Sequence, residues 1–330
     1  MTTTEISSIF DKISGLRIGV IGDFAIDFYY DVEKNTDEFS IETLKEVHWG
    51  SRARTSLGGA GNVVQNLAAL GVGQIAVFGC IGPDLFGREM VYLLQQLEAN
   101  CTYLQTVPTG WETNTYTKPL CQQVEDNRLD FGGKNKLSPP FFEQLLADLD
   151  QALPLLNVLI INQQFSNPLL NTHRLKQLNE VIRQHPHCLY VADMRAVGQY
   201  TQGVTLKVNT SELSAMLGIA LLDASDEKAC IEHGKRLSLR LQEPLLITRG
   251  EQGILYLDAN SIHSVPAIPL DEPIDTVGAG DTVVASFAAA RGTGATLPQA
   301  LQLANLAAAV TVKKLNQTGT ATLQEILELC

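Results

Sequence analysis

The sequence lacks most features that mark secreted or membrane-spanning proteins. Its 330 residues contain no CxxC pair, because the six cysteines are widely separated. We interpret these cysteines as reduced, mostly buried thiols of a cytoplasmic protein. Residues 1–15 are polar and acidic and contain no apolar core segment, which argues against a secretory signal. No stretch approaches 18 uninterrupted apolar residues, so a membrane-spanning helix is not expected.

Positive charge is also scarce. The chain has 24 Lys and Arg residues against 36 Asp and Glu residues, a formal net charge of −12, and the charges are scattered rather than grouped. This balance argues against nucleic acid and against an anionic membrane surface as partners. A phosphorylated substrate would therefore need a local cluster of basic residues. With 45% hydrophobic residues the chain can bury a large core, and it is too short for more than two or three domains.

A dinucleotide-binding fingerprint is missing as well. Residues 58–62 (GGAGN) open an apolar helix over 63–70 that Gly71 closes, but they do not form GxGxxG with a suitably placed acid downstream. A Rossmann-type dehydrogenase is therefore improbable. Glycines at a helix start let a ligand approach the backbone closely, and Asn62 can both donate and accept hydrogen bonds to hydroxyl groups.

A second glycine-rich turn, residues 275–281 (DTVGAGD), follows a β-prone run over 261–268 and precedes an apolar helix over 282–291. The first amides of a helix have no intrahelical partner and attract anions. Asp281 would lie beside such an anion, which is unfavourable unless it accepts a proton from a hydroxyl that attacks a phosphate. An ordinary capping Asp explains the heptapeptide equally well.

Apolar runs alternate with amphipathic helices along most of the chain. The run 16–22 predicts a buried strand, and Asp23 and Asp27 follow it, where open α/β sheets bind ligands. Further elements are expected as strand 74–80, helix 83–99, helix 141–151, strand 158–162, helix 168–184, strands 188–193 and 205–208, helices 210–217 and 226–241, strand 244–248 and helix 297–313. The pattern predicts an α/β domain over 1–330 with a mainly parallel sheet covered on both faces.

Two polar, β-prone segments interrupt this alternation, approximately 28–57 and 106–135, and we interpret them as a small β lid. The second segment shows a period of two around Thr115. Lys118 and Arg128 are candidates for contacting a charged substrate, although solvated strand faces would explain both residues equally well.

Further polar residues follow strands in the second half of the chain. Asn209 and Glu212 lie three apart at a helix start, where they could hold water around Mg²⁺, form a capping box, or do both. The segment 248–253 (TRGEQG) could line an adenosine pocket or form only a hairpin. Asn305 lies in a run of Ala and Leu, which indicates either a flat ligand nearby or close helix packing.

Taken in order, these motifs resemble the ribokinase-like, or PfkB, carbohydrate kinases. The resemblance rests on GDFAID at 22–27, GGAGN, KVNTSE at 207–212, TRGEQG and DTVGAGD, and it extends over almost the whole chain. Within that family, VADMR at 191–195 and the NTSEL run are similar to the kinase half of bifunctional heptose-7-phosphate kinase/adenylyltransferases. Residues 162–165 (NQQF) replace an Asp-Tyr-x-Lys-like stretch common there, and we expect no adenylyltransferase half in this chain.

The resemblance implies a ribokinase-like three-layer sandwich with a β lid, and it implies a role for each matching residue. Asp281 would be the general base, and the amides of Gly278, Ala279 and Gly280 the anion hole. The acceptor sugar would be held by Asp27, Gly59 and Asn62. Mg²⁺ and its waters would be ordered by Asn209 and Glu212. The residues bordering ATP would be Thr248, Gly250, Gly253 and Asn305. A monovalent cation such as K⁺ would lie near Asp275 and the backbone of 316–320.

We therefore predict ATP-dependent transfer of the γ-phosphoryl group to a sugar or sugar-phosphate hydroxyl, with heptose 7-phosphate among the candidates. The base is expected to have an ordinary Asp pKa of ~4. A kinase of another sugar or of a nucleoside, and a silent relative that only binds ligands, remain alternatives. Because lid strands of such kinases often pair between subunits, the resemblance also implies a homodimer through the lid.

Overall fold

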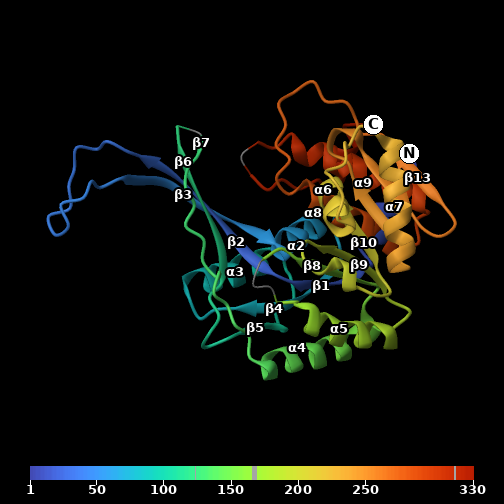
Figure 1. The fold of residues 1–330 in the computed structure, drawn as a ribbon, viewed down its shortest axis with the longest axis horizontal. Coiled ribbons are helices and arrows are strands. Elements are labelled where there is room, and N and C mark those ends of the chain that lie inside the picture. The colour runs from blue at the N-terminus through green and yellow to red at the C-terminus, as the bar shows by residue number, and fades with distance from the viewer. Residues whose placement is uncertain (123, 166–168, 316) are drawn as a thin grey trace.

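The fold is built around a nine-stranded sheet with the order β13-β12-β11-β10-β9-β8-β1-β4-β5 (Figure 1). A computed structural model describes residues 1–122, 124–165, 169–315 and 317–330. The strands are β1 (Arg17–Gly22), β4 (Gln74–Ile81), β5 (Leu104–Thr106), β8 (Val158–Gln163), β9 (Leu189–Met194), β10 (Thr205–Asn209), β11 (Leu245–Thr248), β12 (Ile254–Leu257) and β13 (Ile262–Val265). Neighbours from β11 through to β5 pair in parallel, whereas β12 and β13 join the other edge in antiparallel fashion.

Helices cover both faces of this sheet, which gives the three layers expected from the sequence. One face packs against α1 (Thr3–Ile13), α2 (Ala60–Ala69), α3 (Leu85–Gln96), α8 (Ala279–Gly292), α9 (Leu297–Val312) and α10 (Leu323–Leu327). The other face packs against α4 (Pro139–Ala152), α5 (Thr172–Gln184), α6 (Thr210–Leu217) and α7 (Glu227–Leu241). Three short 3₁₀ turns are η1 (Leu153–Leu155), η2 (Gly198–Tyr200) and η3 (Gly250–Gln252).

Strand β1 shows why the parallel strands are apolar throughout. Ile18 and Val20 enter the core on the α8 face, whereas Ile21 enters the core on the α4 face. Side chains alternate along a strand, so a strand covered on both faces needs apolar residues at nearly every position. This requirement makes such strands readable from sequence.

A second sheet, with the order β3-β2-β6-β7, corresponds to the segments expected to form a lid. Its strands are β2 (Phe24–Glu33), β3 (Trp49–Gly59), β6 (Asn114–Cys121) and β7 (Val124–Glu125). The hairpin formed by β2 and β3 projects far from the rest of the molecule (Figure 1). Strand β2 pairs antiparallel with β3 and parallel with β6. The four-stranded sheet thus joins segments that are distant in the sequence.

The two faces of this lid sheet differ in chemistry. Asp27 and Tyr29 lie on one face of β2, together with Lys118 of β6, whose ammonium contacts both of them. The opposite face carries Phe28, whose ring centroid lies 5.8 Å from that of Phe86 on α3. The apolar face therefore docks the lid on α3, and the opposite face carries the polar cluster of Asp27, Tyr29 and Lys118.

Some expected elements differ from the structure at their ends. Residue 168, where one helix was expected to begin, lies outside the described residues. That helix, expected over 168–184, starts at Thr172, because Asn171 caps it and the Leu169 amide donates to Asp23 instead. Residues 1–15 were interpreted only as a polar segment, yet they contain α1, which buries Ile6, Ile9, Phe10 and Ile13. The helix expected over 83–99 spans Leu85–Gln96, since Asp84 caps its start.

Candidate active site

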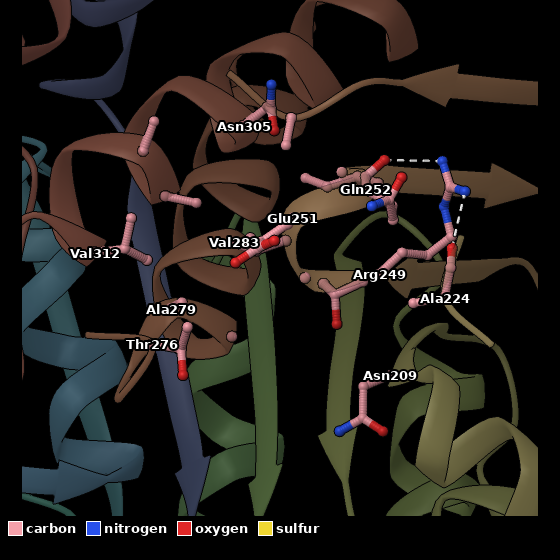
Figure 2. Close-up of a pocket in the computed structure, with 18 of the residues that line it drawn as sticks. Asn209, Ala224, Arg249, Glu251, Gln252, Thr276, Ala279, Val283, Asn305 and Val312 are labelled. Carbon is pink, nitrogen blue, oxygen red and sulfur yellow. Dashed lines mark hydrogen bonds between the residues drawn. The ribbon is translucent and has the colours of Figure 1, made fainter. Parts of the chain in front are cut away.

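A cavity of about 1100 Å³ opens where β10 and β11 end and α8 begins. One wall comes from α8 and α9, including Ala279, Val283 and Asn305 (Figure 2). The facing wall carries Asn209 and the segment around Arg249. Parallel strands place their carboxyl ends at one edge of the sheet, and ligands of open α/β sheets bind there.

The start of α8 has the geometry of an anion site. Its N-cap, Gly278, has φ 79°, a left-handed conformation that favours glycine. A Cβ at Gly278 would also lie 2.8 Å from the Asn62 side-chain nitrogen. At the start of α8 the Ala279 amide donates to the Thr276 carbonyl at 3.2 Å, whereas the Gly280 amide has no acceptor among the described residues, and both residues line the cavity. The structure thus brings the predicted anion-hole residues together at one edge of the cavity.

Asp281 lies in the first turn of α8 and points toward α2. Its Oδ2 accepts a hydrogen bond of 2.8 Å from Asn62 Nδ2. Asn62 Oδ1 in turn accepts from Asn66 Nδ2 at 3.3 Å, and Asn66 Oδ1 accepts from the Thr282 hydroxyl at 2.8 Å. This chain fixes the orientation of the Asn62 amide. Asp281 Oδ1 accepts no hydrogen bond from any residue that the structure describes, so it can receive a proton.

The electrostatic surroundings of Asp281 correct one expectation from the sequence. Burial, together with the nearby Asp193 carboxylate, raises the pKa of Asp281 to about 7, although Asn62, Lys207 and Arg195 act in the opposite direction. The expectation of an ordinary value was therefore wrong. Asp281 is partly open to the cavity, yet protein surrounds its carboxylate, and burial disfavours the charged form. A base with this pKa is half protonated near neutral pH.

An ion pair that the sequence analysis did not identify lies next to Asp281. Lys207 of β10 is opposite Asp193 of β9 in the parallel register, and its Nζ is 3.2 Å from both carboxylate oxygens. Both side chains line the cavity. Burial alone would lower the pKa of Lys207, but the carboxylates of Asp193, Glu212 and Asp281 raise it. The sequence did contain a signal for this ion pair, because Lys207 is a charged residue within an otherwise apolar strand.

Asn209 and Glu212 form a capping box at the start of α6. Asn209 Oδ1 accepts from the Glu212 amide at 2.8 Å, and Glu212 Oε2 accepts from the Asn209 amide at 2.8 Å. Both residues also line the cavity. The capping interpretation is therefore correct, and it leaves Glu212 Oε1 and Asn209 Nδ2 without hydrogen-bond partners among the described residues. The carboxylate oxygen can accept hydrogen bonds from water bound to Mg²⁺, and the amide N–H can donate to a phosphate oxygen.

The wall expected to border a nucleotide consists of the turn between β11 and β12 and the segment after β13. Thr248 ends β11, and Gly250 and Gly253 bound the turn η3 before β12 runs back antiparallel. Asn305 Nδ2 donates to the Pro266 carbonyl at 2.9 Å, which fixes the segment after β13. All four predicted residues line the cavity.

Arg249, which sequence reasoning missed, organises this wall. Its guanidinium donates to the Gln252 carbonyl at 2.9 Å and to the Ala224 carbonyl at 3.3 Å (Figure 2). It also donates to Glu227 Oε2 at 2.9 Å. The side chain is buried, so an arginine in this turn binds protein groups rather than solvent. It connects the turn after β11 to α7.

The predicted acceptor residues come from the lid and α2. Asp27 is buried, and Lys118 Nζ lies 3.2 Å from its Oδ2 and 3.1 Å from the Tyr29 hydroxyl. Burial raises the pKa of Asp27, and Lys118 opposes that rise. Gly59 caps α2 with φ 55°, and a Cβ there would lie 2.4 Å from the Asp23 carbonyl.

Arg128 lies at the other end of the lid face. Its guanidinium is 4.8 Å from the centroid of the Tyr116 ring and 2.6 Å from Asp130 Oδ2. Tyr116 stacks on Phe165 with a centroid distance of 4.8 Å and an interplanar angle of 12°. This stack joins the lid to the segment that follows β8.

Asp23 does not share the ligand-facing position that its place after β1 suggested. Its carboxylate accepts three backbone hydrogen bonds, from the amides of Gln164, Phe165 and Leu169 at 2.7–3.1 Å. Burial raises the pKa of Asp23 to about 6, and the three amides oppose that rise. Asp23 therefore anchors the segment after β8 and, through Phe165, the Tyr116 stack.

The remaining sequence expectations concern ions and cysteines. Asp275 Oδ1 accepts from the Val277 amide at 3.0 Å, and its own amide donates to the Val312 carbonyl at 2.7 Å. Asn316, the start of the backbone stretch expected near a monovalent cation, lies outside the described residues. Across the described residues, no group of three or more His, Cys, Asp or Glu could hold a metal, and no helix could span a membrane. All six cysteines are free, three of them buried.

Comparison with known families gives this geometry its context. Residues 16–323 match the pfkB family of carbohydrate kinases. The chain belongs to the pfkB carbohydrate kinase family. A member of this family is a phosphotransferase with an alcohol group as acceptor, which confirms the kinase prediction.

Curated relatives of this pfkB-family kinase include bifunctional proteins named HldE. The chain is 29% identical over 324 residues to that of Paramagnetospirillum magneticum, covering 96% of this chain and 64% of the relative. It is 31% identical over 315 residues to that of Helicobacter hepaticus, covering 94% and 63%. The chain therefore spans slightly less than two-thirds of these relatives.

Solved structures confirm the ribokinase-like fold. Phosphofructokinase-2 from Escherichia coli in complex with potassium superposes with a TM-score of 0.76 at 18% identity, covering 95% of this chain and 98% of that one. Ribokinase from Arabidopsis thaliana complexed with ribose and ATP gives a TM-score of 0.75 at 18% identity, with the same coverage.

Proposed function

We propose that this pfkB-family kinase transfers the γ-phosphoryl group of ATP to a hydroxyl of a sugar phosphate, with heptose 7-phosphate as the first acceptor to test. One observation carries the proposal. Asp281 offers a free carboxylate oxygen at the first turn of α8, beside the Gly280 amide, which has no acceptor among the described residues, and a cavity of about 1100 Å³. The similarity to HldE proteins and the sequence resemblance to heptose-7-phosphate kinases support the choice of acceptor.

The proposed reaction is in-line transfer. The acceptor oxygen forms a bond to the γ-phosphorus while the bond between that phosphorus and the oxygen of the departing ADP breaks. The hydroxyl proton passes to Asp281, whose orientation Asn62 fixes through a 2.8 Å hydrogen bond. Negative charge that develops on the transferred group meets the amides at the start of α8. Asp27 would hold an acceptor hydroxyl, because Lys118 holds its Oδ2 and its Oδ1 accepts no hydrogen bond from the described residues.

ATP would lie along the wall formed by Thr248, Gly250, Gly253 and Asn305, with its phosphates directed toward α8. Glu212 would hold Mg²⁺ through water with the Oε1 that the capping box leaves available, and Asn209 would orient Glu212 and offer its Nδ2 to a phosphate oxygen. Bound Mg²⁺ supplies charge neutralisation for the phosphates. Asp275 remains our candidate for a K⁺ site.

Arg195 favours a phosphorylated acceptor. It lines the cavity, and its charge acts on the pKa values of both Asp281 and Tyr116. Lys118 and Arg128 each have a carboxylate partner, whereas the Arg195 guanidinium forms no ion pair or hydrogen bond with the described residues. An unpaired guanidinium between the base and the lid suits a phosphate group. Arg195→Gln should raise KM for a sugar phosphate ~10–100-fold and leave KM for the unphosphorylated sugar unchanged.

The proposal is tested by measuring ATP consumption over sugars, sugar phosphates and nucleosides, with Asp281→Asn as the matched inactive control. We expect turnover with a sugar phosphate and little with nucleosides. Turnover only with a nucleoside or an unphosphorylated sugar would overturn the acceptor class. Measurable ATP binding without turnover on any acceptor would instead favour a ligand-binding relative.

We also propose a homodimer through the lid. The tip of the hairpin between β2 and β3 exposes apolar side chains: Ile41 is 95% and Leu44 78% accessible. Such side chains on a projecting sheet are typical of an interface. In analytical ultracentrifugation the wild type should sediment as a dimer and an Ile41→Asp/Leu44→Asp variant as a monomer. A monomeric wild type would contradict this proposal.

A further inference from the structure

Lys207 is an unusual residue for the position that it occupies. It lies in the middle of the central sheet, only 6% of it is accessible, and it still lines the cavity. Its ammonium carries three donors, and Asp193 accepts from it with both carboxylate oxygens at 3.2 Å. The described residues provide no further acceptor for Nζ. A buried ammonium with donor capacity left over therefore borders an open cavity.

The start of α8 brings the anion hole against this ammonium. A Cβ placed on Gly280 would lie 3.1 Å from Lys207 Nζ, tighter than ordinary van der Waals contact. Glycine at position 280 thus lets the helix backbone and the ammonium come close together. The first amides of α8 and Lys207 Nζ therefore converge on the same part of the cavity, where Asp281 also lies.

We propose that Lys207 is a catalytic residue that contacts the phosphoryl group during transfer, and that Asp193 is the residue that positions it. This inference rests on the proposed kinase function. As the bond to the acceptor oxygen forms and the bond to ADP breaks, the oxygens of the transferred group need compensation for their negative charge. Lys207 Nζ supplies it with the N–H that Asp193 leaves unused, while the proton of the acceptor hydroxyl passes to Asp281.

A purely structural ion pair is the competing explanation, and energetics separates the two. A buried pair often contributes little net stability, whereas removing one partner leaves an uncompensated charge. If Lys207 only neutralises Asp193, removing both charges together should restore the enzyme. If Lys207 contacts the phosphoryl group, removing both charges cannot restore turnover, because the donor is still missing.

The test compares Lys207→Met, Asp193→Asn and the double variant Lys207→Met/Asp193→Asn in steady-state assays with the best acceptor. We expect kcat to fall ~10²–10³-fold in Lys207→Met, as for loss of one donor to a developing anion, with KM for ATP changed less than about threefold. The double variant should remain as slow. Lys228→Met on the exposed face of α7 is the matched control and should turn over normally.

A pH profile gives a second readout. The charged groups that act on Asp281 are Asp193, Lys207 and Arg195, and Lys207 lowers its pKa. The acidic limb of kcat/KM should therefore move to higher pH in Lys207→Met, and Lys207→Arg should restore its position and part of the rate. A change confined to packing would leave the limb in place.

The outcomes separate cleanly. Recovery of the double variant to within about fivefold of the wild type would overturn the inference while leaving the kinase function intact. If Lys207→Met does not fold, the rate of the double variant alone decides between the two explanations. That variant leaves no buried charge of this pair unpaired. A wild type that phosphorylates no acceptor would overturn the proposed function and this inference with it.

Discussion

Two Asp–Lys pairs, one that lines the cavity and one in the lid, differ in what surrounds them. Asp193–Lys207 joins adjacent strands of the central sheet, and Asp27–Lys118 joins adjacent strands of the lid, each at 3.2 Å. Further carboxylates, of Glu212 and Asp281, act on Lys207. Lys118 instead donates its other hydrogen bond to the neutral Tyr29 hydroxyl.

The difference shows how the same residue types serve different tasks. In the central pair the lysine ammonium lies against the start of α8, where a Cβ on Gly280 would be 3.1 Å from its Nζ. In the lid pair Lys118 stabilises the charged form of Asp27 within a buried site. We therefore propose that the central pair acts in phosphoryl transfer and the lid pair in acceptor binding.

The largest effect is expected at Asp281, which lies beside the central pair. Asp281→Asn should lower kcat by ~10²–10⁴-fold and leave ATP affinity nearly unchanged, because only the proton acceptor is lost. The matched control is Asp258→Asn, in the exposed turn between β12 and β13. A variant with near-normal turnover, measured in the coupled ATP assay, would remove Asp281 from the mechanism.

The same substitution should change stability with a defined sign. The pKa of Asp281 is raised from 3.8 to about 7 in the folded state, so the wild type loses stability as pH rises between these values. Asp281→Asn lacks this loss, and its free energy of unfolding should exceed that of the wild type by about 1–3 kcal/mol at pH 8. The difference should vanish near pH 4. Urea denaturation at the two pH values measures it, and a variant less stable than the wild type at pH 8 would refute the raised pKa.

Substitutions in the lid pair should act on acceptor binding instead. Asp27→Asn should raise KM for the acceptor ~10–100-fold with kcat changed only a few-fold, because a hydrogen bond to a charged group is lost. Lys118→Met removes the group that opposes the raised pKa of Asp27, so acceptor KM should worsen as pH falls. Steady-state kinetics at several pH values checks both. An Asp27→Asn variant that lowered only kcat would contradict this role in acceptor binding, because the lid pair would then affect the same kinetic constant as the central pair.

A smaller effect is expected at Asp23, which contacts no ligand in this account. Asp23→Ala leaves three amides without their acceptor and should lower the free energy of unfolding by about 2–3 kcal/mol. Asp11→Ala on the exposed face of α1 is the surface control. Because Asp23 also holds Phe165 beneath Tyr116, acceptor KM should rise more than KM for ATP. If the KM values for the acceptor and for ATP change equally, the stack of Tyr116 on Phe165 does not belong to the acceptor site.

The sequence predicted the fold well where local patterns determine it. Strand β1 is apolar at almost every position because both of its faces are buried, and the turn at Gly278 is visible because only glycine suits its backbone. The capping box at Asn209 could also be predicted, because it joins residues only three positions apart in the sequence. Helix α1 was missed, although Ile6, Ile9, Phe10 and Ile13 have helical spacing, because the polar residues between them dominate the composition.

Long-range features of the site were beyond sequence reasoning. The hydrogen bond between Asn62 and Asp281 joins residues 219 positions apart, and the pKa of Asp281 depends on Asp193, Lys207 and Arg195, which belong to other elements. In the sequence Lys207 is a single charge in a short strand, and only the strand register places it opposite Asp193. Asp23 looked like a ligand residue until its three amide partners were visible.

The pH dependence of kcat/KM tests the central claim, that Asp281 accepts the proton of the acceptor hydroxyl, most directly. A base whose pKa is raised to about 7 must lose its proton before it can act, so kcat/KM should fall as pH drops below about 7, toward one decade per pH unit. The residual rate of Asp281→Asn should show no such limb. A wild-type rate that stays constant down to pH 5 would contradict the account.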